Sequence, residues 1–242
     1  AGQDNKIWIS WLVDSFVSYN GYTYMVGLHG ISSKTGEQAS AIFRVSESGD
    51  HLEIVWENEW DVFPAVPEGT SNNYLNTFSV DKLSGEFYAQ GAYQIVRGNL
   101  NDLSSIKAEI VPPDCFGCCQ CLTWETTWVD WKTRTIYGAG GPKPRDEKRF
   151  RKRLLDGGDW VELEPKTLET NLNYWASGTM AGTSVEDLYL TSTYGIYKYH
   201  PEKESWDYAF NPPVEYGSWT DIYHSYYRAL SVIHDDKGNY RA

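Results

Sequence analysis

A short aromatic segment recurs five times along this chain, at intervals of about fifty to sixty residues. Each copy follows an apolar run and a polar turn, and the copies end at Tyr24, Tyr88, Tyr137, Tyr189 and Tyr240. A repeat of this length whose members are made of strands is typical of propeller blades, each of which is a small four-stranded sheet. The sequence therefore predicts an all-β fold, a β-propeller.

A second pattern with the same period predicts four strands, A to D, in each repeat. An apolar residue followed by a base recurs at Phe43-Arg44, Val96-Arg97, Phe150-Arg151 and Tyr197-Lys198. A new alternating run follows each pair and contains a bulky residue: Trp56, Ile106, Trp160 or Trp206. Alternation with aromatic and β-branched residues indicates strands. The tyrosine then lies in strand B, the base in strand C and the bulky residue in strand D, and helix is expected to be minor.

The chain is predicted to be a single domain, residues 1–242, because no linker-like stretch divides it. Five blades are favoured, with four or six as alternatives. The fifth repeat reads as strand A at Tyr226–Ile233 and the start of strand B at Asn239–Ala242. Either Lys6–Leu12 closes the ring by pairing with the last blade, or the remaining strands lie beyond residue 242, since an open ring exposes sheet edges.

Charge and hydropathy exclude several classes of partner. The net charge of −12 and the pI of about 4.8 disfavour nucleic acid and anionic membranes as partners. No apolar run is long enough to span a membrane. The chain begins with Ala1 rather than Met and has clustered cysteines, so we expect a secreted, extracellular protein whose leader has been removed.

Because successive strands of a blade run in opposite directions, successive connections emerge at opposite ends of the ring. The B–C and D–A connections emerge at one end, called here the long-loop end because the long loops of the chain fall there; the A–B and C–D connections, mostly tight turns, emerge at the other, the turn end. Long loops on a rigid ring are the usual place for function. An aromatic ring beside a carboxylate suits either a sugar or a protein partner. The candidate ligand-binding residues are Trp60, Asp61, Tyr74, Trp124, Tyr174, Trp175, Trp219, Asp221 and Tyr223. For any one of them, packing between blades is the alternative.

All four cysteines lie within seven residues of one D–A connection: Cys115, Cys118, Cys119 and Cys121. In an extracellular protein an even number of cysteines favours two disulfides, with three possible pairings. A metal site is the first alternative, because Cys-x-x-Cys can present two thiolates to one ion, and free thiols are the second. Such closely spaced ligands would wrap an ion under strain, which favours disulfides.

The segment Lys143–Arg153 is the one strongly basic stretch in this acidic chain. Arginine matches sulfate and carboxylate groups through two parallel hydrogen bonds, so Arg145 and Arg149 are added to the candidate ligand-binding residues. The ligand would be an anionic glycan or an acidic partner. The alternative is a solvated run of charge that offsets the acidic surface.

Catalytic motifs are absent: the sequence has no Gly-x-Ser-x-Gly, His-Glu-x-x-His, phosphate-binding loop or dinucleotide fingerprint. The sequence weighs against an enzyme without deciding the question, and it names no catalytic residue and no cofactor. The favoured function is recognition of a glycan or an extracellular protein. One alternative is a propeller hydrolase or lyase acting on a sugar or lactone, with a divalent ion in the central channel. Another is a structural subunit of an extracellular assembly, for which homo-oligomers remain open.

Several turns resemble those of known propeller families. Asp156–Trp160 and Ser46–Asp50 look like degenerate Asp-box turns of sialidase-type propellers. Phe78–Asp81 with Gly85–Tyr88, and Trp128–Asp130 with Thr135–Tyr137, are similar to the repeats of YWTD and lactonase-like propellers. The resemblance implies a propeller fold. It carries over no arginine triad and no calcium-ligand set.

Overall fold

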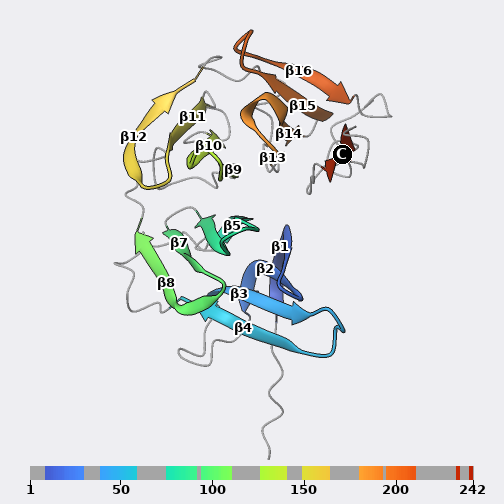
Figure 1. Ribbon diagram of the computed structural model, residues 1–242, viewed down its shortest axis with the longest axis vertical. Helices are drawn as coiled ribbons and strands as arrows, with labels where there is room; N and C mark the ends of the chain where they lie inside the picture. The colour runs from blue at the N-terminus through green and yellow to red at the C-terminus, as the bar shows by residue number, and fades with distance from the viewer. Residues whose placement is uncertain are drawn as a thin grey trace, which may run out of the picture. The chain divides into compact units, whose positions relative to one another are not determined.

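A computed structural model describes ten stretches of the chain: residues 9–29, 39–58, 75–91, 94–110, 126–140, 149–163, 180–192, 195–210, 233–234 and 240–241. The chain divides into two compact halves, Ala1–Pro112 and Pro113–Ala242. Each half contains two four-stranded antiparallel sheets (Figure 1). The expectation of a single domain stays a prediction.

The N-terminal half contains the first two sheets, in each of which the strands lie side by side in chain order. The strands of the first are β1 (Ile9–Tyr19), β2 (Tyr22–His29), β3 (Ala39–Ser46) and β4 (Leu52–Glu57). Those of the second are β5 (Leu75–Val80), β6 (Glu86–Gly91), β7 (Gln94–Asn99) and β8 (Asp102–Ile110). This is the meander that the A-to-D pattern predicts for a propeller blade.

The C-terminal half repeats the arrangement. The strands of the third sheet are β9 (Thr126–Asp130), β10 (Thr135–Gly140), β11 (Arg149–Leu154) and β12 (Gly157–Glu162). Those of the fourth are β13 (Met180–Gly182), β14 (Leu188–Ser192), β15 (Gly195–His200) and β16 (Ser205–Phe210), and a 3-10 turn at Val185–Asp187 is the helical element in the described part of this half. A two-stranded sheet of β17 (Ile233–His234) and β18 (Tyr240–Arg241) follows.

The predicted strand positions are confirmed in all four blades. The repeated tyrosines lie in the second strand of each sheet, and Tyr240 lies in β18. The repeated bases lie in the third strands, where Arg44 faces Tyr24 and Arg97 faces Tyr88 across the ladder. The fold is thus an all-β propeller of four-stranded blades. Strand β18 falls within the segment predicted as strand B of a fifth blade, and the count of five stays a prediction.

Part of the N-terminal segment Lys6–Leu12 belongs to the first blade. Ile9–Leu12 begins β1, the first strand of that blade, and pairs with β2, while closure of the ring by this segment stays a prediction. The turn between the two strands explains this outcome. Asn20 and Gly21 both have positive φ, 46° and 77°, as a two-residue hairpin turn requires, and such a turn pairs the strands on either side of it.

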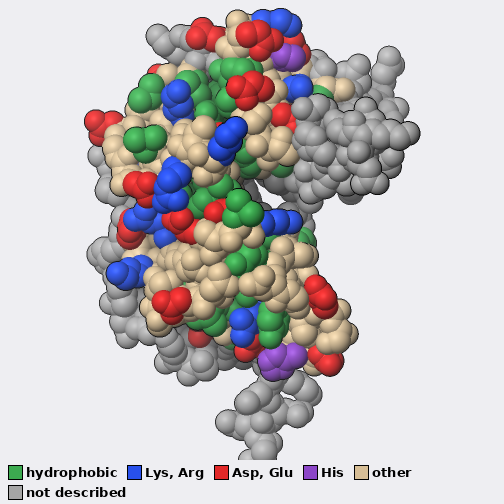
Figure 2. Space-filling model, viewed as in Figure 1, with side chains coloured by type: hydrophobic (Ala, Val, Ile, Leu, Met, Phe, Trp, Pro, Cys, Tyr) green, Lys and Arg blue, Asp and Glu red, His purple; other side chains and the backbone are tan. Residues whose placement is uncertain are grey.

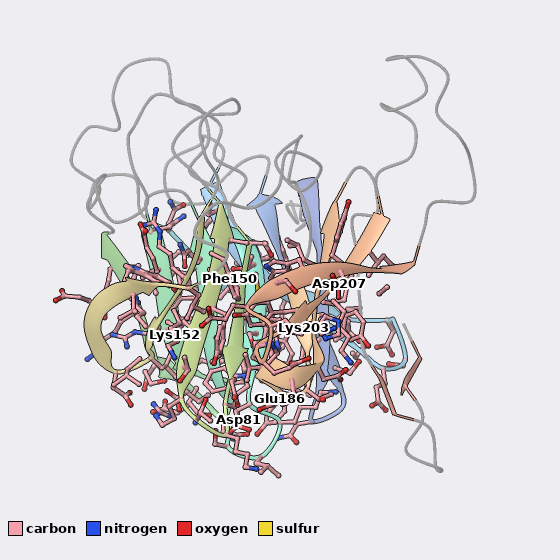
Figure 3. All side chains as sticks on the ribbon, turned by 90° about the horizontal axis from the view of Figure 1, so that it is seen from above. Asp81, Phe150, Lys152, Glu186, Lys203 and Asp207 are labelled. Carbon is pink, nitrogen blue, oxygen red and sulfur yellow. The ribbon has the colours of Figure 1, made fainter. Side chains whose placement is uncertain are left out.

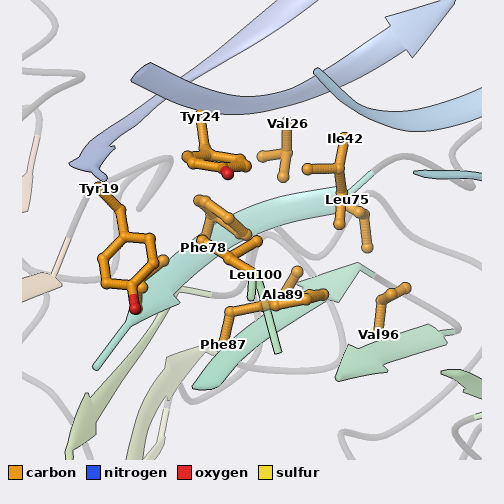
Figure 4. Close-up of a cluster of buried hydrophobic side chains, with 11 residues drawn as sticks. Tyr19, Tyr24, Val26, Ile42, Leu75, Phe78, Phe87, Ala89, Val96 and Leu100 are labelled. Atoms are coloured by element: carbon orange, nitrogen blue, oxygen red, sulfur yellow. The ribbon is translucent and has the colours of Figure 1, made fainter. Parts of the chain in front are cut away.

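The core of the N-terminal half lies between its two blades (Figure 4). Tyr24, Val26 and Ile42 of the first blade contact Phe78, Phe87 and Ala89 of the second. Side chains alternate along a strand. Because Phe87 and Ala89 point at the first blade, Tyr88 lies on the opposite face of its own sheet. Tyr24 therefore faces the next blade in the chain, and Tyr88 lies on the corresponding face of the second sheet.

The C-terminal half is built in the same way. Tyr137 and Phe150 of the third blade pack with Leu188, Leu190 and other residues of the fourth. Phe150 is fully buried, and its ring meets the rings of Tyr137, Tyr199 and Trp206 at centroid distances of 6.1, 4.8 and 5.1 Å. Tyr189, between Leu188 and Leu190, lies on the opposite face of its sheet. All four tyrosines thus mark the same face of their blades.

Each blade has two distinct ends. At the turn end, strands are joined by short turns such as Asn20-Gly21 and Leu155-Asp156. At the long-loop end, the D–A connections are much longer: 58–74, 111–125, 163–179 and 211–232. The prediction that the long connections emerge at one end is confirmed for the D–A connections, whereas the B–C connections of the second and fourth blades are only two residues long, 92–93 and 193–194. Within the described residues, no helix is long and apolar enough to cross a membrane.

Candidate functional site

Most of the predicted ligand-binding residues lie outside the described part of the chain. They are Trp60, Asp61, Tyr74, Trp124, Arg145, Tyr174, Trp175, Trp219, Asp221 and Tyr223. The four cysteines, Cys115, Cys118, Cys119 and Cys121, also lie outside it. Arg149 is described in its backbone only and is the first residue of β11. These assignments stay predictions. The described part of the long-loop end consists of the strand ends that carry the long connections.

Buried polar side chains gather at the long-loop end of the blades. Of the buried polar residues in the described strands, three lie at the turn end: Asp130, Thr135 and Asp187. The others lie within a few residues of a long-loop-end connection: Ser40, Glu57, Asn58, Thr77, Gln90, Gln94, Thr126 and Thr127. Burying amides and hydroxyls costs free energy unless they are hydrogen-bonded. The blades therefore retain polar groups where packing alone would favour apolar ones.

Asn58 is the most constrained member of this group. It directly follows β4, and its backbone N–H donates to the Ser40 carbonyl over 3.0 Å. The residue is 1% exposed, yet neither Nδ2 nor Oδ1 of its amide has a hydrogen-bond partner among the described residues. An unmet buried polar group costs about 1–3 kcal/mol. Such a group calls for an explanation, of which a functional role or an ordered water is the usual one.

Gln90 and Gln94 flank the B–C connection of the second blade, and both are buried. The Tyr88 hydroxyl donates to Gln90 Oε1 over 2.5 Å, which fixes the orientation of that amide. The amide nitrogen of Gln90 then points away from Tyr88, because the two ends of an amide are opposed. The second blade thus adds two neutral amides to the polar groups at the long-loop end.

In the C-terminal half, polar groups of β9 hold the first strands of two blades together. Thr126 Oγ1 accepts a hydrogen bond from the Met180 backbone N–H over 2.9 Å, and Trp128 Nε1 donates to the Gly182 carbonyl over 3.1 Å. Both bonds join β9 to β13. Figure 3 shows Phe150 toward the long-loop end of this half and Glu186 at its turn end. The Thr126 hydroxyl, at the long-loop end of β9, is thus already hydrogen-bonded within the fold.

The turn end is organised by aspartates that cap backbone turns. Asp81 accepts from Leu83 N–H and the Ser84 hydroxyl, at 3.1 and 2.6 Å. Hydrogen bonds from the Ser48 and Ser46 hydroxyls lower the pKa of Asp50. The two Asp-box-like segments both form C–D turns, between β3 and β4 and between β11 and β12. These aspartates stabilise turns, since short hairpins favour such side-chain bonds to the backbone.

The described residues contain no group of three His, Cys, Asp or Glu side chains placed to hold a metal ion. The ion considered for the hydrolase alternative thus has no ligand set in this part of the chain. Among the described residues, the buried polar side chains at the long-loop end offer amide and hydroxyl donors and acceptors and one carboxylate, that of Glu57. Chemically, that set suits a neutral, hydroxyl-rich ligand better than a charged one.

Sequence reasoning missed the buried amides. Gln90, Gln94 and Asn58 are polar residues beside apolar strand residues, a pattern that also fits a solvent-facing side chain. A signal was present in the second blade. Gln90 and Gln94 flank a connection of two residues, at strand ends that the tyrosine and base repeats already placed on the long-loop side.

No protein-family model matches the sequence, and no curated protein matches it. Among solved structures, fructan 1-exohydrolase IIa from Cichorium intybus is similar, with a TM-score of 0.54, 12% identity, and coverage of 98% of this chain and 51% of that one. The extracellular domain of BT4673, a putative one component system from B. thetaiotaomicron, gives a TM-score of 0.52, 12% identity, and coverage of 99% and 27%. The structure of a nidogen/laminin complex gives a TM-score of 0.47 and 10% identity, with coverage of 84% of this chain and 81% of that one.

This chain spans about half of the exohydrolase chain and about a quarter of the BT4673 chain. At identities this low the similarity concerns the fold. The comparisons and the four meandering sheets agree on one conclusion, which is that this chain has a β-propeller fold. One fold of this kind hosts many functions, so the function has to be argued from the site.

Proposed function

We propose that this propeller is a binding protein that recognises a carbohydrate through the long-loop end of its blades. The observation that carries the proposal is the buried Asn58 amide, whose donor and acceptor atoms lack partners in the part of this end that the structure describes. A sugar hydroxyl both donates and accepts, so a hydroxyl or a ligand-bound water can satisfy both atoms. The aromatic and acidic residues of the D–A connections, such as Trp60 and Asp61, provide the matching sequence chemistry.

The proposal is tested with Asn58→Leu. Leucine keeps the branched shape of asparagine and removes its polar atoms, so the unfolding free energy should stay the same or rise by about 1–3 kcal/mol. A panel of neutral oligosaccharides identifies the ligand, and calorimetry then compares the variant with the parent. The variant should bind at least about tenfold more weakly, which corresponds to about 1.4 kcal/mol.

Thr135→Val is the matched control, since it removes a buried hydroxyl at the turn end. It should lower stability and leave binding unchanged. If Asn58→Leu binds the ligand as tightly as the parent, Asn58 has no part in recognition. If no neutral oligosaccharide binds, the proposal is wrong, and release of reducing sugar from the panel would favour the hydrolase alternative.

An extracellular location is part of the same proposal. Four cysteines within seven residues favour two disulfides, which persist in oxidising compartments. The mass of the intact protein, measured with and without reductant, tests this. An increase of about four mass units on reduction is expected for two disulfides; an unchanged mass would contradict it.

A further inference from the structure

The turn between β1 and β2 holds the one Asn-Gly step in the sequence, Asn20-Gly21. Both residues are exposed, and both have positive φ, 46° and 77°. Asparagine tolerates this conformation better than most residues, which is why it favours the first position of such turns. An amide side chain thus directly precedes a residue without a side chain, at the exposed tip of a hairpin.

The Asn20 side chain connects the first blade to the second. Its Nδ2 donates a hydrogen bond to Asn101 Oδ1 over 3.0 Å. Asn101 is exposed and lies in the turn between β7 and β8, at the same end of the blades as the Asn20-Gly21 turn. Both blades belong to the N-terminal half of the chain. This bond is called here the asparagine bridge.

The orientation of the Asn101 amide is fixed by two further hydrogen bonds. Its Nδ2 donates to Tyr19 Oη over 2.8 Å and to the Ser84 carbonyl over 2.9 Å. An amide nitrogen has two N–H groups, and both are used. The amide can turn its nitrogen toward Asn20 only by giving up both bonds. The bridge therefore accepts a donor at position 20 and disfavours an acceptor.

We propose that Asn20 is a site of spontaneous deamidation, and that the reaction breaks the asparagine bridge. The Gly21 backbone nitrogen, having lost its proton to solvent base, attacks Asn20 Cγ. The bond between Cγ and Nδ2 breaks, and the nitrogen takes up a proton and leaves as ammonia. Water then opens the resulting five-membered succinimide at either carbonyl, which gives aspartate or isoaspartate at position 20. The sequence requires water alone as co-reactant and involves no oxidation or reduction.

The position of the turn favours this reaction at Asn20. Gly21 has no Cβ to hinder ring closure, and its carbonyl accepts a hydrogen bond from Glu47 N–H over 3.1 Å. Exposed hairpin tips open locally at low free-energy cost, which lets the nitrogen reach Cγ. The exposed Asp156-Gly157 step differs, because Arg134 donates to both carboxylate oxygens over 2.7 Å, and an ionised carboxylate resists nucleophilic attack.

Either product replaces a donor by a carboxylate that faces Asn101 Oδ1. Two acceptors cannot bond to each other, and Asp102 adds a carboxylate to the same turn. Figure 2 shows acidic and basic side chains intermixed over the described surface, and the product adds a negative charge to a net charge of −12. Isoaspartate also lengthens the backbone of the turn, and turn length sets the register of a hairpin.

The reaction is tested by incubating the full chain at neutral and at alkaline pH, folded and in urea, followed by tryptic digestion. The peptide of residues 7–34 reports on the site, because Asn20 supplies its one side-chain amide. Deamidation adds about one mass unit to it. An isoaspartyl methyltransferase assay measures the isoaspartate. The peptide of residues 98–107 is the internal control, because Leu100 and Asp102 follow its two asparagines.

Two variants test the ring closure. Gly21→Ala adds a Cβ that meets no atom within 4 Å, so hindrance of the attack rather than a clash slows the reaction. Asn20→Gln keeps an amide and requires a six-membered ring. Both should react at least about tenfold more slowly than the parent. The parent should react faster at alkaline pH, and folded chain should react within about tenfold of the chain in urea. Slower reaction of the folded chain, or equal conversion of the control peptide, would overturn the proposal.

A double-mutant cycle tests the effect on the bridge. Asn20→Asp, which reproduces one product, should raise the unfolding equilibrium constant by about fivefold in urea unfolding. In the Asn101→Ala background the same change should raise it by less than about twofold, because the opposing acceptor is gone. Equal effects in the two backgrounds would show that deamidation does not act through the asparagine bridge.

Discussion

Replacing Gly85 with alanine should break the hydrogen-bond network that joins the first two blades at the turn end. Gly85 has φ +80°, where a side chain is strained by about 1–2 kcal/mol. A Cβ there would lie 2.6 Å from both Asn101 Nδ2 and Tyr19 Oη. Those two atoms are hydrogen-bonded to each other over 2.8 Å, and Asn101 Nδ2 also donates to the Ser84 carbonyl over 2.9 Å. Asn101 can move away only by giving up these bonds.

Two lost hydrogen bonds at about 1 kcal/mol each bring the expected cost of Gly85→Ala to about 3–4 kcal/mol. Gly49→Ala is the control, because Gly49 has φ +74° and no atom within 4 Å of the added Cβ, so only the strain of about 1–2 kcal/mol applies. Urea unfolding followed by tryptophan fluorescence should show a midpoint lowered by about 1 M for Gly85→Ala and by less for the control. Equal costs for the two variants would show that the network contributes nothing.

Three further predictions concern buried and paired side chains. Burial, with smaller effects of the Asp130 and Glu186 charges, raises the pKa of the Tyr137 hydroxyl to about 12. The neutral form therefore contributes its full share of the unfolding free energy below about pH 10, and this contribution is lost as the pH rises toward 12. Tyr137→Phe should therefore gain up to about 2 kcal/mol over the parent near pH 12 in denaturant unfolding, and an equal pH dependence in both proteins would contradict this. Phe150→Ala should cost about 3–5 kcal/mol in the same assay, because a fully buried ring is removed; a cost below about 1 kcal/mol would mean that the core collapses around it. Arg134→Met should cost less than about 1 kcal/mol at low salt and nothing measurable at high salt, since the side chains of Arg134 and Asp156 are 42% and 65% exposed; a larger, salt-independent cost would refute this.

The fold was predictable because its signals are local and repeated. Tyr88 marks a second strand and Val96-Arg97 a third strand, and each depends on alternation over a few residues. The pairing of Ile9–Leu12 was harder to predict, because an apolar strand is compatible with several partners. The nearest hairpin turn, at Asn20-Gly21, decided the pairing.

The site was less predictable than the fold. Lone amides such as Asn58 and Gln94 give no periodic signal, and only the burial of their strand ends distinguishes them from surface residues. The buried Nε of Arg153 likewise has no acceptor among the described residues, a feature that depends on which groups approach it in space. The charge run itself was visible in the sequence, and the division of its bases between two sheet faces followed from strand alternation.

The shared orientation of the four tyrosines has a consequence for how such a chain can change in length. In each described pair of blades, the tyrosine face of one sheet meets the opposite face of the next, a head-to-tail contact of the heterologous kind. A contact of this kind can be repeated, because each sheet carries both the tyrosine face and the face that receives it. Side-chain complementarity therefore imposes no upper limit on the series, and duplication of a whole repeat would reproduce a junction that already exists.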